Sequence, residues 1–398
     1  MPAVVARLKR FVRSAFFNVV WIPSVAVVLA GSAPPYIVAW VVWRGATAFL
    51  PKWVYQVGDD FLYFIYQNCV LFFFEYMTGV QVLVDGDYKE IFSKKENAIY
   101  LGNHQSTVDW VLSNMVAVRQ GSLGNLRYVM KSSLQQIPLY GLYFYEHGCI
   151  YVNRGNFDPE KMIAGLSYLR HPRINTWMVV FPEGTRYGLA RKPRSTSNAI
   201  DNSAPLQLAA QQDGNLPDVK KEGSLRTPKV ELKHHLTPKS RGTWLALQTL
   251  RQQTNAVYSA SVVYDGCIDE TGKRRVAPQI LGFLRRESKW IYIHLKRIPI
   301  DEVPSREADF QAWLDDLFTE KDKLIGDFFS PDAETRSRAL ARGKPARSHL
   351  AAAIFGLVTM AAISIPFFLS SAGKALYWKV TIFGSLIGYS RLALAAVA

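Results

Sequence analysis

The sequence predicts an α/β domain, with a mixed sheet flanked by helices, and membrane helices at both ends of the chain. Short apolar runs that read as strands alternate with helical patterns, which is typical of an α/β layer structure. Uncharged stretches near both termini are long enough to cross a hydrocarbon core of roughly 30 Å. We therefore expect a basic segment with membrane or interfacial helices (1–78), the α/β domain (79–330), and a charged linker with C-terminal membrane segments (331–398).

The first membrane segment is predicted at Val19–Trp43, which carries no charged residue and follows a basic start. A cleaved signal peptide is the alternative, but the run is long and Pro34-Pro35 come directly after its small residues. Those prolines predict a break, or a re-entrant helix pair in place of a straight span. A shorter apolar run, Phe61–Phe74, reads as a core or interfacial helix.

At the other end, Ala351–Leu369 is uncharged and again long enough to span a bilayer. Ala375–Ala398 is mostly apolar, but Lys379 and Arg391 interrupt it. We expect a C-terminal hairpin whose turn lies at Ser370–Lys374.

Between these ends the elements alternate. Strands are predicted at Val80–Val84, Ala98–Leu101, Ile150–Val152, Trp177–Phe181, Val257–Tyr264 and Trp290–Leu295. Helices are predicted at Ser106–Arg119, Asp158–His171, Thr243–Gln253 and Ser305–Phe329, the second opened by an Asp158 N-cap and Pro159. Residues 187–230 are rich in Pro, Ser, Asn, Gln and Gly, and we expect a flexible surface insertion there.

The composition narrows the partners. A formal net charge of +15 favours anionic surfaces such as phospholipid headgroups and phosphorylated substrates. Nucleic acid is not expected, because no binding signature accompanies the charge. The 3 cysteines have unrelated spacings and predict neither a disulfide framework nor a metal site, so a reducing environment is the simpler interpretation.

A candidate catalytic pair, His104 and Asp109, follows the strand predicted at Ala98–Leu101. A neutral imidazole at a strand end can take a proton from an alcohol, and a carboxylate on its other nitrogen fixes the tautomer. The alternative is structural: Ser106–Asp109 is also a capping box, in which the carboxylate bonds only to the backbone.

A second motif, Phe181-Pro-Glu-Gly-Thr-Arg186, ends another apolar strand. Its glycine lets backbone amides approach an anion, and Arg186 offers a bidentate fork for phosphate, while Glu183 would orient a substrate hydroxyl or hold Arg186. An ordinary turn with a surface ion pair is the alternative. A third junction, Gly148–Arg154, places another arginine after a short strand, and an exposed arginine is the simpler interpretation of it alone.

Taken together, in this order and at these spacings, the segments resemble the glycerolipid acyltransferases, and among them the 1-acylglycerol-3-phosphate acyltransferases. His104–Asp109 looks like the first motif of that family, Gly148–Arg154 like the second and Phe181–Arg186 like the third. Ala256–Val263 is similar to the fourth but lacks the proline common there. Further stretches resemble the epsilon and lysocardiolipin-acyltransferase branch, namely Leu71–Glu75, Asn103–Trp110, Pro138–Gly141, Leu236–Lys239 and Val263–Gly266.

The resemblance implies direct attack of the sn-2 hydroxyl of 1-acyl-glycerol-3-phosphate on acyl-CoA, with no other cofactor and no metal. It implies His104 as general base and Asp109 as its orienting partner. The implied glycerol-phosphate contacts are Arg154, Glu183, Gly184, Thr185, Arg186 and Lys131. It also implies an integral membrane protein of the endoplasmic reticulum or nuclear envelope, with a mitochondrial membrane as the alternative.

Other interpretations stay open at this point. The acceptor could be another lysophospholipid, such as lysocardiolipin or lysophosphatidylinositol, or the protein could be a membrane scaffold without catalysis. A hydrolase is disfavoured, because no GxSxG elbow supplies a nucleophile. The aromatic run Tyr140–Tyr145 predicts either an acyl-chain channel or core packing. His234-His235 is interpreted as a solvated face, and the neighbouring Lys233, Lys239 and Arg241 as contacts to anionic lipid.

Overall fold

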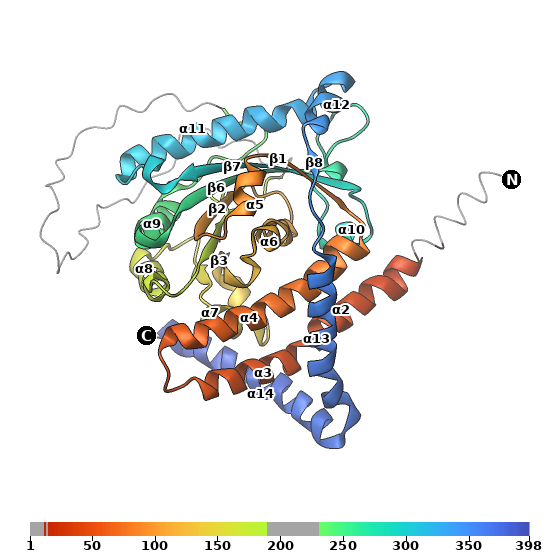
Figure 1. Ribbon diagram of the computed structural model, residues 1–398, viewed down its shortest axis with the longest axis vertical. Helices are drawn as coiled ribbons and strands as arrows, with labels where there is room; N and C mark the ends of the chain where they lie inside the picture. Colours follow the sequence, from red (N-terminus) through yellow and green to blue (C-terminus); the bar gives the residue numbers. More distant parts are fainter. Residues whose placement is uncertain (1–11, 13–14, 189–230, 398) are drawn as a thin grey trace, which may run out of the picture.

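The predicted α/β class is confirmed by a computed structural model, which describes residues 12, 15–188 and 231–397 (Figure 1). The insertion predicted at 187–230 lies almost entirely outside the described residues. The strands are β1 (Gln81–Gly86), β2 (Ala98–Gly102), β3 (Leu126–Lys131), β4 (Ile150–Val152), β5 (Trp177–Val180), β6 (Ala256–Tyr264), β7 (Trp290–Pro299) and β8 (Lys344–Pro345).

These strands form one mixed sheet in the order β4-β3-β5-β2-β6-β7-β1-β8. The first five neighbours run parallel, β7 is antiparallel to β6, β1 is parallel to β7, and β8 is antiparallel to β1. All six predicted strands are present. The sequence patterns missed β3 and β8, and β8 lies in the charged stretch Ser330–Arg347 that was expected to be a linker.

Helices cover both faces of the sheet (Figure 1). Because successive side chains of a strand point to opposite faces, the sheet separates two hydrophobic cores. On one face Ile99 and Leu101 of β2 pack with α8, α9 and α11. On the other face Ala98 and Tyr100 pack with α6 and α4 (Lys52–Leu71). The helices of the α/β part are α5 (Tyr88–Ser93), α6 (Asp109–Gln120), α7 (Tyr140–Glu146), α8 (Pro159–Ser167), α9 (Ser240–Leu250), α10 (Ile280–Leu284), α11 (Glu307–Gly326) and α12 (Ala333–Ala341).

The cap predicted for the second of these helices is present. The Asp158 carboxylate accepts a hydrogen bond from the Lys161 amide, and Pro159 occupies the first turn of α8. The helix ends in a short 3₁₀ turn, Tyr168–Arg170, before Pro172. The local signals therefore set both ends of α8.

The N-terminal apolar segment is one helical run from Phe16 to Ala46, long and apolar enough to cross a membrane. A single residue, Ser32, separates α2 (Ile22–Gly31) from α3 (Ala33–Ala46), and in Figure 1 the two follow one another in nearly one line. Hydrogen bonds from the Ser32 amide to Val28 and from the Tyr36 amide to Ser32 keep the helical spacing across the break. The prolines thus start α3 rather than reverse the chain, so the re-entrant pair is not formed.

The second apolar run belongs to a longer helix than predicted, α4 (Lys52–Leu71), continued by a π-helix at Phe72–Met77. Its polar side chains point into the protein. Asn114 of α6 donates to the Gln67 amide oxygen at 2.7 Å, for example. These internal bonds explain why α4 is long although its apolar core is short, and they attach it to the α/β domain.

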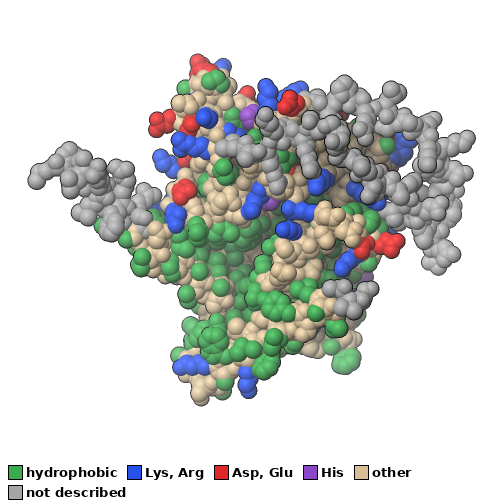
Figure 2. All heavy atoms as spheres, turned by 180° about the vertical axis from the view of Figure 1, so that it is seen from behind, with side chains coloured by type: hydrophobic (Ala, Val, Ile, Leu, Met, Phe, Trp, Pro, Cys, Tyr) green, Lys and Arg blue, Asp and Glu red, His purple; other side chains and the backbone are tan. Residues whose placement is uncertain are grey.

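The C-terminal segment forms the expected hairpin, α13 (Leu350–Leu369) and α14 (Ser371–Val397), joined at Ser370 (Figure 1). Hydrophobic side chains on these helices and on α2 and α3 face outward, for example Val27, Val358 and Leu369. Figure 2 shows them as a broad apolar surface below the part of the molecule where Lys, Arg, Asp and Glu gather. Such a surface on two membrane-length helices is that of a membrane protein.

Candidate active site

The predicted site residues follow four neighbouring strands of the sheet. Because β4, β3, β5 and β2 are adjacent and parallel, their carboxyl ends meet at one edge. In this strand order the edge carries Arg154, Lys131, the turn Glu183–Arg186 and His104. Ligands of open α/β sheets bind at such edges. The topology therefore brings all of the predicted site segments to the same side of the molecule.

His104 and Asp109 form a pair, as their spacing predicts. His104 Nδ1 lies 2.7 Å from Asp109 Oδ2, and the imidazole stacks on the ring of Phe181 with centroids 4.7 Å apart. The Asp109 side chain is only 4% exposed, whereas that of His104 is 19% exposed. Within the described part of the chain His104 Nε2 has no hydrogen-bond partner. With Nδ1 on the carboxylate, Nε2 is the nitrogen that can accept a proton.

Asp109 also organises the loop that carries the histidine. Its Oδ2 accepts hydrogen bonds from the Gln105 and Ser106 amides at 2.7 and 2.9 Å, in addition to His104. One of the two bonds of a capping box is therefore present, since the Asp109 carboxylate accepts from the Ser106 amide. The second bond is replaced, because the Ser106 hydroxyl accepts from the Val108 amide, which precedes the helix. The structural and the catalytic interpretations of Asp109 are compatible, since one oxygen serves both.

The amides of this loop are already used. The N–H groups of His104 to Val108 donate in turn to Glu183, to Asp109 twice, to Gln279 and to the Ser106 hydroxyl. An oxyanion needs donors that are free to point at it. These five amides are therefore not available to stabilise an oxyanion in this geometry.

Glu183 is buried, with 2% of its surface exposed, and connects two loops. Its Oε1 accepts from the His104 amide at 2.8 Å and its Oε2 from the Leu236 amide at 3.0 Å. Burial raises the pKa of this carboxyl to about 8. Among the described residues it forms no ion pair with Arg186. Because both oxygens are occupied, the geometry makes Glu183 a brace for the His104 loop, which differs from the substrate contact that the motif implies.

Gly184 shapes the second motif. Its φ of +66° lies in the left-handed region, and its amide closes a turn onto the Phe181 carbonyl at 3.0 Å. Lys239 lies over this turn: its amide donates to the Pro182 carbonyl, and its Nζ would be 3.7 Å from a Cβ placed at Gly184. The predicted lipid-facing Lys239 is therefore at the site itself.

Two arginines, Arg154 and Arg186, lie close enough at the edge for their charges to interact. Burial and the neighbouring Arg186 charge both lower the pKa of Arg154. Both arginines are exposed, and neither forms an ion pair with a carboxylate in the described ranges. Lys131 is exposed as well, and it pairs with Val152, two residues before Arg154, across β3 and β4. Adjacent, uncompensated cations on a strand edge fit a phosphate group.

The similarity to one known relative shows the family of this chain. The 1-acyl-sn-glycerol-3-phosphate acyltransferase epsilon of Mus musculus is 37% identical over 366 residues, which is 91% of this chain and 93% of that protein. The chain belongs to the 1-acyl-sn-glycerol-3-phosphate acyltransferase family.

Two family models, a further relative and a solved structure are also similar to parts of the chain. Residues 84–200 match the family model described as acyltransferase, and residues 282–350 match the acyltransferase C-terminus. A probable 1-acyl-sn-glycerol-3-phosphate acyltransferase 5 of Arabidopsis thaliana is 30% identical over 65% of this chain and 60% of its own length. The crystal structure of the acyltransferase PlsC from Thermotoga maritima covers 80% of this chain and 97% of its own, at 14% identity and a TM-score of 0.41.

In this acyltransferase two buried groups near the His104–Asp109 pair carry no local signal in the sequence. Tyr264, at the end of β6, donates to Asp109 Oδ1. Lys321 of α11 donates to the carbonyls of Leu101, near the end of β2, and of Ala260, in the middle of β6, and burial lowers the pKa of its amine to about 7. Each residue is far from the motif in the chain, and only the sheet brings it there.

The interpretation of His234-His235 as a solvated face is wrong for His235. That ring is buried, and its Nδ1 lies 3.1 Å from Asp322 Oδ1 of α11. The same carboxylate accepts from the amides of Lys233 and His234. Because α11 supplies a partner for three donors, the polar segment folds inward beside the active site.

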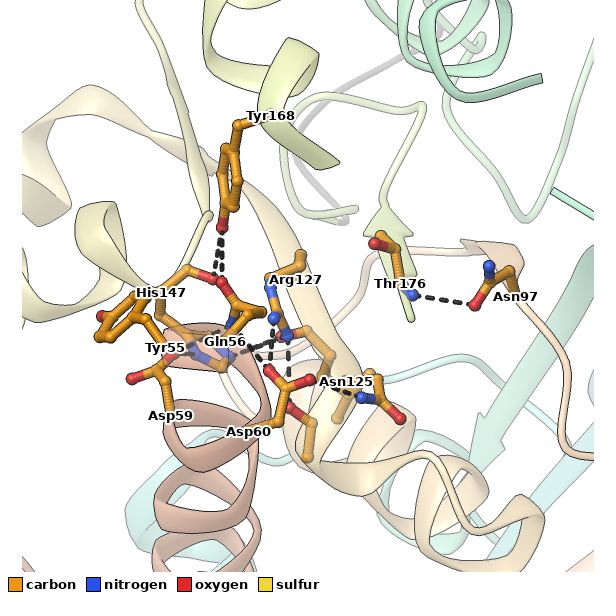
Figure 3. Close-up of polar contacts among 12 residues, drawn as sticks. Tyr55, Gln56, Asp59, Asp60, Asn97, Asn125, Arg127, His147, Tyr168 and Thr176 are labelled. Carbon is orange, nitrogen blue, oxygen red and sulfur yellow. Dashed lines mark hydrogen bonds and ion pairs between the residues drawn. The ribbon is translucent and has the colours of Figure 1, made fainter. Parts of the chain in front are cut away.

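A second polar cluster joins α4 to β3, away from the site (Figure 3). Asp59 Oδ2 lies 2.5 Å from His147 Nδ1, and Asp60 Oδ1 lies 2.5 Å from Arg127. Asp59, Asp60 and His147 are close enough to share a cation. However, the Arg127 guanidinium lies 3.2 Å from His147 Nε2, so a positive charge already occupies the centre of the cluster. The donor set therefore fits an internal ion-pair network and not a metal site.

Proposed function

We propose that this protein transfers an acyl group from acyl-CoA to the sn-2 hydroxyl of 1-acyl-glycerol-3-phosphate, giving phosphatidate and free CoA in phospholipid synthesis. One observation carries the proposal. An imidazole with a buried carboxylate on Nδ1 shares a strand edge with two neighbouring arginines, and among the described residues neither Nε2 nor the two guanidinium groups have a polar partner. A base for an alcohol beside an anion site is what a phosphorylated alcohol requires.

In this mechanism His104 Nε2 removes the proton of the sn-2 hydroxyl while its oxygen attacks the thioester carbonyl. The Asp109 carboxylate stabilises the imidazolium that forms. When the tetrahedral intermediate collapses, the carbon–sulfur bond breaks and the imidazolium returns the proton to the departing CoA sulfur. The thioester is already activated, so no covalent acyl-enzyme and no further cofactor are needed, and positioning supplies much of the rate enhancement.

The phosphate of the acceptor is assigned to the exposed cations of the strand edge. Arg154 and Arg186 provide the two forks, and the turn at Gly184 and Thr185 lets the backbone approach the anion. We add Lys239 to the predicted Lys131, because its ammonium lies over the Gly184 turn. Glu183 contributes indirectly by holding the His104 loop against this turn.

The membrane helices give the protein access to a lipid substrate. In this proposal the outward apolar surfaces of α2, α3, α13 and α14, which Figure 2 shows as a broad green area, enter the bilayer. The strand edge would then have to lie near the headgroup region, where a lysolipid phosphate resides. We assign the protein to the endoplasmic reticulum or nuclear envelope membrane, with a mitochondrial membrane as the alternative. A lysocardiolipin or lysophosphatidylinositol acceptor would present the same phosphate chemistry, and the intact His104–Asp109 pair disfavours a non-catalytic scaffold.

The test uses purified full-length protein in lipid nanodiscs, assayed with several acyl-CoA lengths and a panel of lysolipid acceptors. His104→Ala should lose at least about 10²-fold in kcat, the typical contribution of general acid–base catalysis. His294→Ala is the matched control, because His294 also pairs with an aspartate, Asp85, but lies on β7 away from the edge. Full activity of His104→Ala with every acceptor would contradict the mechanism.

The acceptor site has its own variant. Arg186→Ala should raise KM for lysophosphatidate about tenfold or more and leave KM for acyl-CoA nearly unchanged, because one charged contact to phosphate is lost. Arg306→Ala, which removes an arginine with 80% side-chain exposure on α11's N-terminal side, is the control. Equal losses toward both substrates would argue against a phosphate contact, and a preference for another acceptor would redirect the substrate assignment.

A further inference from the structure

Tyr264 stands at the end of β6, directly beside the catalytic pair. Strand β6 is parallel to β2, with Ala260 opposite Gly102, so Tyr264 extends past the end of β2 at the same edge from which His104 emerges. The side chain is fully buried and packs edge-on against Phe283. Its hydroxyl therefore has a fixed position relative to the loop His104–Asp109.

The hydroxyl donates a hydrogen bond of 2.5 Å to Asp109 Oδ1. The other oxygen of that carboxylate, Oδ2, accepts all three remaining bonds, from His104 Nδ1 and from the Gln105 and Ser106 amides. Tyr264 is thus the one donor to Oδ1 among the described residues. Asp109 is held at both oxygens, from two different segments of the fold.

The hydroxyl stays a donor throughout catalysis. Burial, followed by the Asp109 charge, raises the pKa of Tyr264 well above its usual value. Two other titratable groups lie near it, and they are neutral for the same reason: burial raises the pKa of Tyr100 and raises that of Cys267 to about 11. Asp109 is therefore the group whose charge the hydroxyl stabilises.

We propose that Tyr264 is a positioning residue for the catalytic pair, an inference that rests on the proposed function. Its hydroxyl fixes the rotation of the Asp109 carboxylate so that Oδ2 stays on His104 Nδ1. It also disperses part of the negative charge of that carboxylate, which sets how tightly the imidazolium is held. His104, Asp109 and Tyr264 then act as one relay, of which only the first two residues are visible in the motif.

The same strand offers a matched control. Tyr258 lies six positions earlier on β6, is equally buried, and donates its hydroxyl to another carboxylate, that of Glu96, at the opposite end of the strand. Tyr264→Phe and Tyr258→Phe therefore remove the same group from the same strand and each break one hydrogen bond to a carboxylate. They differ in whether that carboxylate belongs to the catalytic pair.

Both variants are assayed in nanodiscs with lysophosphatidate and acyl-CoA, and their unfolding temperatures are measured. Tyr264→Phe should lower kcat about tenfold, the effect of losing one hydrogen bond to a charged group, with both KM values nearly unchanged. The acid limb of its kcat/KM profile should move to higher pH by roughly half a unit, because a less dispersed carboxylate holds the imidazolium more strongly. Tyr258→Phe should keep both kcat and the acid limb.

A Tyr264→Phe variant with wild-type kcat and an unmoved acid limb would overturn the proposal, as would equal loss of activity in both variants. An Asp109→Ala background adds a second test, in which Tyr264→Phe should cost nothing further because its partner is gone. Additive losses there would count against the relay. The proposed function fails separately, if His104→Ala remains active, so the two failures are distinguishable.

Discussion

Two histidine–aspartate pairs in this protein have the same contact and opposite surroundings. In the pair His104–Asp109, Nδ1 and Oδ2 are 2.7 Å apart, and in the pair His147–Asp59 they are 2.5 Å apart. His147 is completely buried, and its Nε2 lies 3.0 Å from the Leu126 carbonyl. His104 is partly exposed at the strand edge. The difference is access to the second ring nitrogen, not the pair itself.

The comparison extends to two further pairs, His235–Asp322 and His294–Asp85. His235 lies beside the active site but its side chain is completely buried, and His294 lies on β7, away from the carboxyl ends of β4, β3 and β5 where the cations gather. A carboxylate on Nδ1 fixes an imidazole, but general-base catalysis also needs an Nε2 that a substrate can reach. We therefore propose catalysis for the pair whose loop starts at the carboxyl end of β2, and a structural role for the others.

Among these variants, Asp109→Asn should have the largest effect, which is on the kcat of the enzyme, because it alters the accessible His104–Asp109 pair. The amide cannot stabilise the imidazolium, and replacement of the equivalent carboxylate in a serine-protease triad costs on the order of 10⁴ in kcat, so we expect a loss of 10³-fold or more, roughly. The unfolding temperature should fall only slightly, because the loop keeps an acceptor oxygen at this position. Steady-state kinetics and thermal unfolding in detergent measure the two effects. A loss below tenfold would remove the reason for treating the two pairs differently.

Asp60→Ala tests the buried polar cluster around His147 and should lower the free energy of unfolding without changing kcat (Figure 3). It leaves the fully buried Arg127 without its carboxylate, and breaking such a pair costs about 3–5 kcal/mol. The control is Asp309→Ala, which breaks the exposed ion pair with Arg306 and should cost far less, because water and salt screen that pair. Denaturant unfolding reports both values. Equal costs for the two variants would mean that the cluster does not hold α4 to β3.

The buried His235 predicts a smaller, pH-dependent effect. Burial lowers its pKa to about 4, so between pH 6.5 and 4 the unfolded chain binds a proton that the folded protein does not. Stability should therefore fall as the pH is lowered through this window, by up to about 3 kcal/mol from this residue. In His235→Asn the slope should be shallower over the same range. Thermal unfolding at several pH values measures it, and an unchanged slope would show that His235 is not held neutral.

The strands show where sequence patterns succeed. Five strands were predicted from short apolar runs, which reflect burial on both faces of a sheet, and Val80–Val84 was predicted from its alternating pattern. Strand β3 was missed because Arg127 and Lys131 interrupt its pattern. Arg127 is buried only because Asp60, 67 positions away, neutralises it. No local pattern contains that partner.

The candidate site likewise contains contacts that local spacing predicts and contacts that only the fold creates. His104 and Asp109 are five positions apart and meet through one loop, so their contact could be predicted from spacing. Lys239, Tyr264 and Lys321 come from other segments and reach the site through the sheet order and the packing of α11. Glu183 shows the converse, since its motif placed it at the site but only the fold shows that its oxygens bond to backbone amides.

By itself the sequence determined the α/β class, the apolar membrane helices, the local His104–Asp109 pair and the motif segments. Each of these depends on side-chain periodicity or on spacing along a few residues, which the chain fixes before it folds. The tertiary structure decided which histidine–aspartate pair is open, which cations adjoin the base and which groups support Asp109. These depend on strand order, because parallel neighbours bring together the ends of segments that are distant in the chain.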